Sequence, residues 1–188
     1  GEVVRIGAAA GVDLVLIETM SDSYELKAAV LAGKENCDLP VLVTVIFDEN
    51  GKMLTGGTVD SAVAMLEGLR VDALGVNCGL GPKQMLPIVK RLTEVSSLPV
   101  IVNPNAGLPR SENGKTVYDI DADEFAALMG EIADLGVQVL GGCCGTTPAQ
   151  IRKMIETCKG HYFVPVEPKQ RTEVSALSQA AEVGTRPG

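Results

Sequence analysis

The chain has little aromatic content: its 188 residues include no tryptophan, three phenylalanines and three tyrosines. Its core must therefore be built from aliphatic side chains, which suits parallel strands buried on both faces between helices. It also has one histidine, His161, so most sites in which histidine acts as a general base or a metal ligand are excluded. No apolar run approaches the length of a membrane span and no signal peptide is visible, so we expect no membrane partner.

Basic residues are in the minority, with 16 lysines and arginines against 24 acidic residues and a net charge of −8. They are scattered along the sequence, which argues against a nucleic-acid surface. The cysteines are odd in number and no secretory signal accompanies them. This predicts a reducing, cytoplasmic location and favours metal binding or catalysis over a disulfide framework. The five are Cys37, Cys78, Cys143, Cys144 and Cys158.

Apolar runs typical of strands alternate five times with segments of helical periodicity. Such alternation predicts a parallel sheet with right-handed crossovers, and hence an α/β fold. A doubly wound sheet and a (β/α)8 barrel both fit this periodicity, although five units are too few to close an eight-stranded barrel. The expected strands are 12–17, 41–47, 72–76, 99–102 and 137–140, and the expected helices are 22–35, 59–69, 82–95, 122–135 and 148–158.

Three segments fall outside this alternation. Residues 2–10 read as the end of a preceding helix, and a polar loop through Tyr118 is expected after the fourth strand. From Lys159 onward the sequence has scattered prolines and charges and weak periodicity, with one short helix expected around 175–181. We interpret residues 159–188 as a linker or extension.

Polar residues cluster where the predicted strands end, and cysteines are prominent among them. Cys78 follows the third strand, while Cys143 and Cys144 follow the fifth in a run of glycines. Neighbouring side chains of a strand point to opposite faces, but glycines let the backbone leave strand geometry, so both sulfurs can face one site. Three thiolates with one open position can hold a catalytic zinc ion that keeps a substrate thiol ionised.

Other interpretations of these residues stay open. The cysteines could be inert core residues or a redox pair, and the glycine-rich residues 141–147 could cradle a phosphate. Glu18, at the end of the first strand, could bind a substrate ammonium group or cap a helix. Cys37 and Cys158 are expected to be structural.

Two separated motifs carry a resemblance to a known family: residues 76–79, Val-Asn-Cys-Gly, and residues 141–148, Gly-Gly-Cys-Cys-Gly-Thr-Thr-Pro. Residues 16–22 and 104–109 add to it. Through these segments the chain resembles the homocysteine S-methyltransferase family over about residues 1–158. The resemblance implies a (β/α)8 TIM barrel, of which residues 1–158 would be an incomplete part covering about units four to eight.

The resemblance also implies a chemistry. Zinc would be bound by Cys78, Cys143 and Cys144, the homocysteine amino group by Glu18, and the fourth zinc position would be filled by Asn105 before homocysteine arrives. The zinc-bound homocysteine would then accept a methyl group to give methionine.

Within the family, the likeness is closest to the amino-terminal module of cobalamin-dependent methionine synthases. This implies methylcobalamin as the methyl donor, regenerated by methyltetrahydrofolate, with folate- and cobalamin-binding modules of the parent chain as partners. Residues 159–188 would then lead toward the next module. The alternatives are a donor such as betaine or S-methylmethionine, and a non-catalytic barrel fragment that needs its missing amino-terminal part.

Overall fold

The computed structural model describes residues 1–161 and 164–184 and contains one five-stranded sheet. Every neighbouring pair is parallel, as the alternating pattern predicts. The strands lie in the order in which they occur in the chain, without the reversal that marks a doubly wound sheet, so the winding is of the barrel type. In order they are β1 (Val15–Met20), β2 (Val41–Val45), β3 (Ala73–Asn77), β4 (Val100–Asn103) and β7 (Val139–Leu140).

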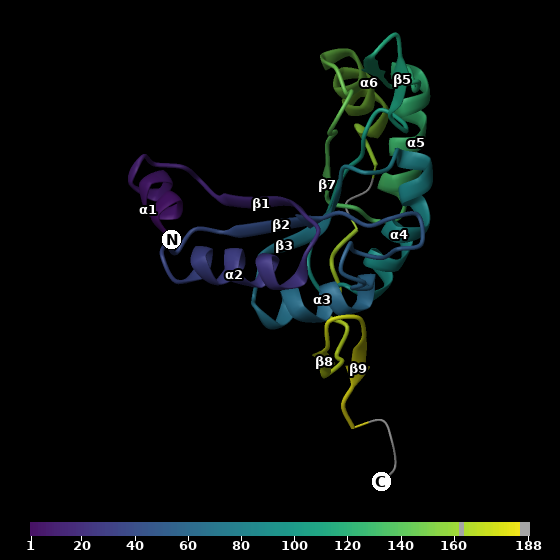
Figure 1. The fold of residues 1–188 in the computed structure, drawn as a ribbon. Coiled ribbons are helices and arrows are strands. Elements are labelled where there is room, and N and C mark those ends of the chain that lie inside the picture. The colour runs from purple at the N-terminus through teal and green to yellow at the C-terminus, as the bar shows by residue number, and fades with distance from the viewer. Residues whose placement is uncertain (162–163, 185–188) are drawn as a thin grey trace.

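Helices follow the strands, and Figure 1 shows helices covering one side of the curved sheet. The five predicted helices are confirmed with small changes at their ends. Local side-chain contacts explain where two of them begin: Asp22 accepts a hydrogen bond from the Glu25 amide at 2.8 Å, and Thr147 forms a capping box with Gln150. The helices are α1 (Glu2–Ala9), α2 (Ser23–Lys34), α3 (Val59–Gly68), α4 (Pro82–Val95), α5 (Ala122–Asp134) and α6 (Pro148–Cys158).

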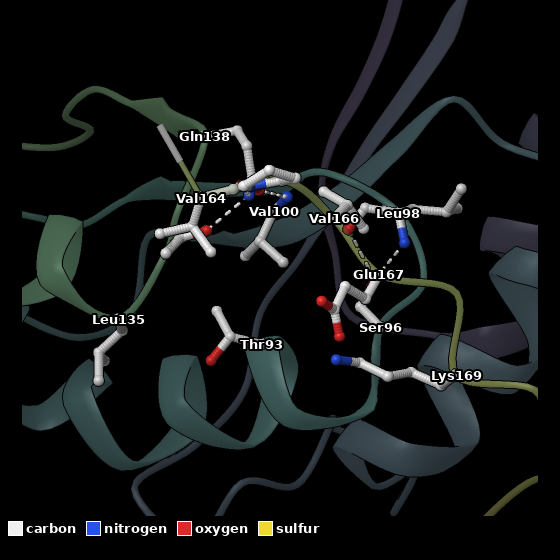
Figure 2. A pocket seen from close by; sticks show the side chains of 12 residues that line it. Thr93, Ser96, Leu98, Val100, Leu135, Gln138, Val164, Val166, Glu167 and Lys169 are labelled. Atoms are coloured by element: carbon white, nitrogen blue, oxygen red, sulfur yellow. Dashed lines mark hydrogen bonds between the residues drawn. The ribbon is translucent and has the colours of Figure 1, made fainter. Parts of the chain in front are cut away.

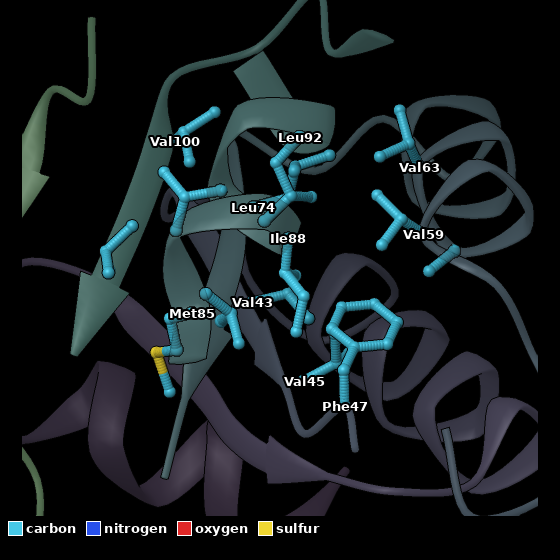
Figure 3. Packing of buried hydrophobic residues seen from close by; sticks show 14 of the residues in the cluster. Val43, Val45, Phe47, Val59, Val63, Leu74, Met85, Ile88, Leu92 and Val100 are labelled. Atoms are coloured by element: carbon cyan, nitrogen blue, oxygen red, sulfur yellow. The ribbon is translucent and has the colours of Figure 1, made fainter. Parts of the chain in front are cut away.

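The core lies between the sheet and these helices and is almost entirely aliphatic. Figure 3 shows Val43 and Leu74 of the sheet beside Ile88 and Leu92 of α4, with Phe47 among them. The central strand β3 is buried along its whole length, whereas the edge strands β1 and β7 are only partly covered. The low aromatic content therefore corresponds to a core of small branched side chains.

The loop expected through Tyr118 contains a short hairpin, made of β5 (Arg110–Glu112) and β6 (Lys115–Val117). Asn113 and Gly114 form its turn, with φ angles of 51° and 74°. An Asn-Gly pair is the sequence signal for such a turn.

The prediction of a short helix around residues 175–181 is wrong. This segment forms a second hairpin, β8 (Glu173–Ser175) and β9 (Ala180–Glu182), which packs against α3. The Ser175 hydroxyl donates to the Ser61 carbonyl at 2.7 Å, so tertiary contact outweighs the local helical tendency of a segment too short to form a stable helix. Residues 162–163 and 185–188 of the expected linker lie outside the described residues.

Among the described residues, no helix combines the length and the apolar character needed to span a bilayer.

Candidate metal centre

The three cysteines that follow β3 and β7 meet at the carboxyl edge of the sheet. The Sγ atoms of Cys78 and Cys144 lie 3.7 Å apart, those of Cys143 and Cys144 lie 3.9 Å apart, and all three lie within 4.8 Å of one another. Zinc–sulfur bonds of about 2.3 Å at tetrahedral angles place the sulfurs about 3.8 Å from one another. The spacing and the all-sulfur donor set therefore fit a zinc ion with a fourth position left for another ligand.

The loop after β4 holds the two cysteine segments in this arrangement. Backbone amides tie Cys143 to the Pro104 carbonyl at 2.7 Å and Cys78 to the Asn103 carbonyl at 3.1 Å. The Asn105 Oδ1 accepts a hydrogen bond from the Cys144 amide at 3.0 Å. Three strand ends therefore share one network, which holds the backbone of the three cysteines together.

The backbone around the two adjacent cysteines is not that of a strand, which lets both side chains serve one site. The chain leaves strand geometry after Leu140, and Gly145 has a φ of 79°, which side chains rarely adopt. A Cβ atom at Gly145 would lie 2.3 Å from the ring of Tyr118, so that ring packs directly on the backbone next to Cys144. The expectation that both sulfurs turn toward one site is confirmed.

Burial and mutual repulsion make the site unfavourable for negative charge unless a cation is bound. Burial raises the pKa of the Cys143 thiol to about 11, and the neighbouring Cys78 and Cys144 sulfurs add to the shift. The pKa of Tyr118 is also raised, by partial burial and then by the charge of Cys144. A divalent cation would relieve this repulsion by stabilising the thiolates.

The other predicted site residues lie at the same edge of the sheet. Asn105 is buried beside Cys144. Glu18 is exposed near the carboxyl end of β1 and is not part of the cysteine cluster. Cys37 follows α2 and Cys158 ends α6, and neither belongs to the cluster. Their structural role stays a prediction.

Two residues at the site have no role in the sequence prediction. Tyr118 packs on the cysteine loop from the end of the β5–β6 hairpin. Asn77 is fully buried and makes hydrogen bonds to Thr19 and toward Cys143. The position of Asn77 directly before Cys78 was visible in the sequence, but its contacts depend on residues 58 and 66 positions away.

A pocket of about 330 Å³ lies at the opposite end of the strands (Figure 2). It is lined by Val100 and Gln138, near the starts of β4 and β7, and by Val164, Glu167 and Lys169 of the carboxy-terminal extension. None of the predicted site residues lines it. In folds with parallel strands, function concentrates at the carboxyl ends, so we place the functional site at the cysteines.

Comparison with known proteins agrees with the motifs. A family model described as homocysteine S-methyltransferase matches residues 2–158. The methionine synthases of Mycobacterium leprae and Mycobacterium tuberculosis are 38% and 41% identical over 94% and 77% of this chain. The chain spans only 16% and 13% of the length of those two proteins.

Solved structures show the same fold. The apo form of the homocysteine methyltransferase MmuM from Escherichia coli is similar with a TM-score of 0.63 at 23% identity, covering 83% of this chain and 56% of that one. Its metallated form gives 0.61 at 25% identity, covering 81% and 50%. The family model, which covers most of the chain, and the cysteine motifs agree: the chain belongs to the homocysteine S-methyltransferase family.

Proposed function

We propose that this chain is the zinc-binding part of an enzyme that transfers a methyl group to the sulfur of homocysteine, giving methionine. The observation that carries the proposal is the cluster of Cys78, Cys143 and Cys144, whose sulfurs lie within 4.8 Å of one another in a member of this family. When bound there, zinc supplies the positive charge that keeps a substrate thiol ionised at neutral pH. With three sulfur ligands it leaves one position for that thiol.

The chain's own residues would then bind and orient the substrate. The three cysteines hold the ion, and Glu18 near the end of β1 binds the homocysteine ammonium group. Asn105 keeps the Cys144 amide in place and is the proposed fourth ligand before substrate arrives. A carbonyl oxygen has two lone pairs, so the hydrogen bond at 3.0 Å leaves one for a metal.

We further propose that residues 1–158 form units four to eight of a (β/α)8 barrel and that residues 159–188 lead toward a following module. The partly exposed edge strands β1 and β7 support this, because a closed barrel would pair both. Activity would then require the full-length protein. The five cysteines are all free, which fits the proposed cytoplasmic location.

For the methyl donor we propose methylcobalamin, regenerated by methyltetrahydrofolate on other modules of the parent protein. The support is the similarity to two methionine synthases that are far longer than this chain. Betaine and S-methylmethionine are the alternatives, and an assay of the full-length protein with each donor separates the three.

The test of the proposed function is zinc content together with methyl transfer in the full-length protein. We expect one zinc per chain and methionine formation, and we expect Cys143→Ser to lose both. Cys158→Ser is the matched control, because Cys158 is half-buried but lies outside the cluster. Wild-type protein that holds no zinc would refute the proposal.

A further inference from the structure

Asn77, the last residue of β3, has 0% exposure, and its side chain reaches two other parts of the site. Its Oδ1 accepts a hydrogen bond from the Thr19 amide at 2.9 Å, and its Nδ2 donates to the Thr19 hydroxyl at 2.7 Å. Strand β2 separates β1 from β3 in the sheet, so this amide group passes over the end of β2 to reach β1. Asn77 therefore ties together two strands that do not pair.

Thr19 adopts a backbone conformation that needs such support. Its φ is 63°, in the left-handed region, which is unusual for a β-branched residue. The pairing of β1 with β2 is irregular at this point, between Ile17 and Met20. Outliers of this kind persist where the surroundings hold them, and Asn77 holds both the amide and the hydroxyl of Thr19.

The remaining contact of Asn77 points toward the metal centre. Its Nδ2 lies 3.9 Å from the Sγ of Cys143, within the range of a hydrogen bond to sulfur. An amide nitrogen carries two hydrogens, so one can serve Thr19 and the other Cys143. A thiolate that binds a metal is a stronger acceptor than a thiol, so this contact gains strength when an ion is present.

We infer that Asn77 is a positioning residue that couples the metal centre to the strand end carrying Glu18. The inference rests on the proposed function, since it assigns Asn77 a part in that same site. One side chain fixes the direction of the Cys143 sulfur and the bend at Thr19, and the bend sets the orientation of the neighbouring Glu18. Metal affinity and substrate affinity would then depend on different contacts of a single amide group.

Two substitutions separate these contacts. In Asn77→Asp, one carboxylate oxygen still accepts from the Thr19 amide and the other can accept from the Thr19 hydroxyl, but no hydrogen remains for Cys143. In Thr19→Val, the hydroxyl is lost while the contact to Cys143 is kept. The measurements, on the full-length protein, are zinc affinity by competition with a chelator and the KM for homocysteine.

We expect Asn77→Asp to weaken zinc binding by about 10- to 100-fold, the usual effect of losing a residue that orients a ligand. We expect Thr19→Val to raise the KM for homocysteine by about two- to tenfold, the effect of one lost hydrogen bond, with zinc affinity unchanged. A purely structural role for Asn77 would not produce this split. Should Asn77→Asp not fold, Asn77→Ser removes the same donor without adding charge, and we expect about a tenfold loss of zinc affinity.

Two results would overturn the inference. One is wild-type zinc affinity in whichever Asn77 variant folds, and the other is loss of zinc from Thr19→Val. In both cases the wild-type protein would still bind zinc and methylate homocysteine, so the proposed function would stand. Wild-type protein that neither binds zinc nor methylates homocysteine would instead refute the proposed function, and the inference with it.

Discussion

At the scale of single residues, Cys143 decides how the metal centre responds to pH. Burial raises the pKa of its thiol to about 11, so the thiol keeps its proton across the physiological range when no metal is bound. The proposed zinc ion would bind the thiolate and would have to displace that proton. The same burial that makes the free site resist ionisation therefore makes metal binding depend on pH.

We expect zinc affinity to rise with pH between 6 and 8, with Cys143 alone contributing a factor of about ten per pH unit. The sign follows from the raised pKa: as pH falls, protons compete more strongly with zinc for the sulfur. Chelator competition at several pH values, corrected for protonation of the chelator, measures the slope. Constant affinity across this range would show that the Cys143 thiol is already ionised in the free protein.

At the scale of elements, β3 and β4 approach each other so closely that one position of β3 has no room for a side chain. Gly75 lies in the middle of β3, and a Cβ atom there would lie 1.8 Å from the carbonyl oxygen of Ile101 in β4. Since the obstacle is backbone, it cannot move aside without breaking the ladder that also positions Asn77 and Cys78. The metal centre therefore depends on a strand contact that only glycine permits.

We expect Gly75→Ala to lower the free energy of unfolding by about 3 kcal/mol or more, as overpacking at a rigid site does. Gly68→Ala is the matched control. Gly68 ends α3, and no atom of the described residues lies within 4 Å of a Cβ added there, so we expect a change of no more than about 1 kcal/mol, in the stabilising direction. Urea unfolding of the full-length protein measures both. Equal effects of the two substitutions would contradict the argument.

The sequence predicts the elements well where local signals agree. The helices expected at 22–35 and 148–158 are confirmed, and in the structure Asp22 and Thr147 cap their first turns. It fails at residues 173–182, where contact with α3 selects a hairpin over the expected helix. It also leaves Asn77 without a role, because the contact to Thr19 crosses an intervening strand and depends on a left-handed residue that no local pattern reveals.

At the scale of the whole molecule, the sheet has two strands whose outer edges no described residue pairs. β1 bonds only to β2, and β7 only to β4. Apolar side chains at these edges are partly open to solvent, with Leu16 of β1 44% exposed and Val139 of β7 41% exposed. Unpaired parallel strands with apolar side chains are prone to join other chains. The proposed missing barrel units would cover both edges.

We expect the isolated 188-residue chain to self-associate, because its unpaired edge strands and exposed apolar side chains have no other partner. Leu16→Lys places a charge on the edge strand β1 and should shift the chain toward monomer. Leu54→Lys is the control, since Leu54 is 85% exposed but lies outside the sheet, and we expect no shift. Sedimentation velocity over a range of protein concentrations measures the association. A wild-type chain that stays monomeric, or an equal response to both substitutions, would show that the sheet edges do not drive association.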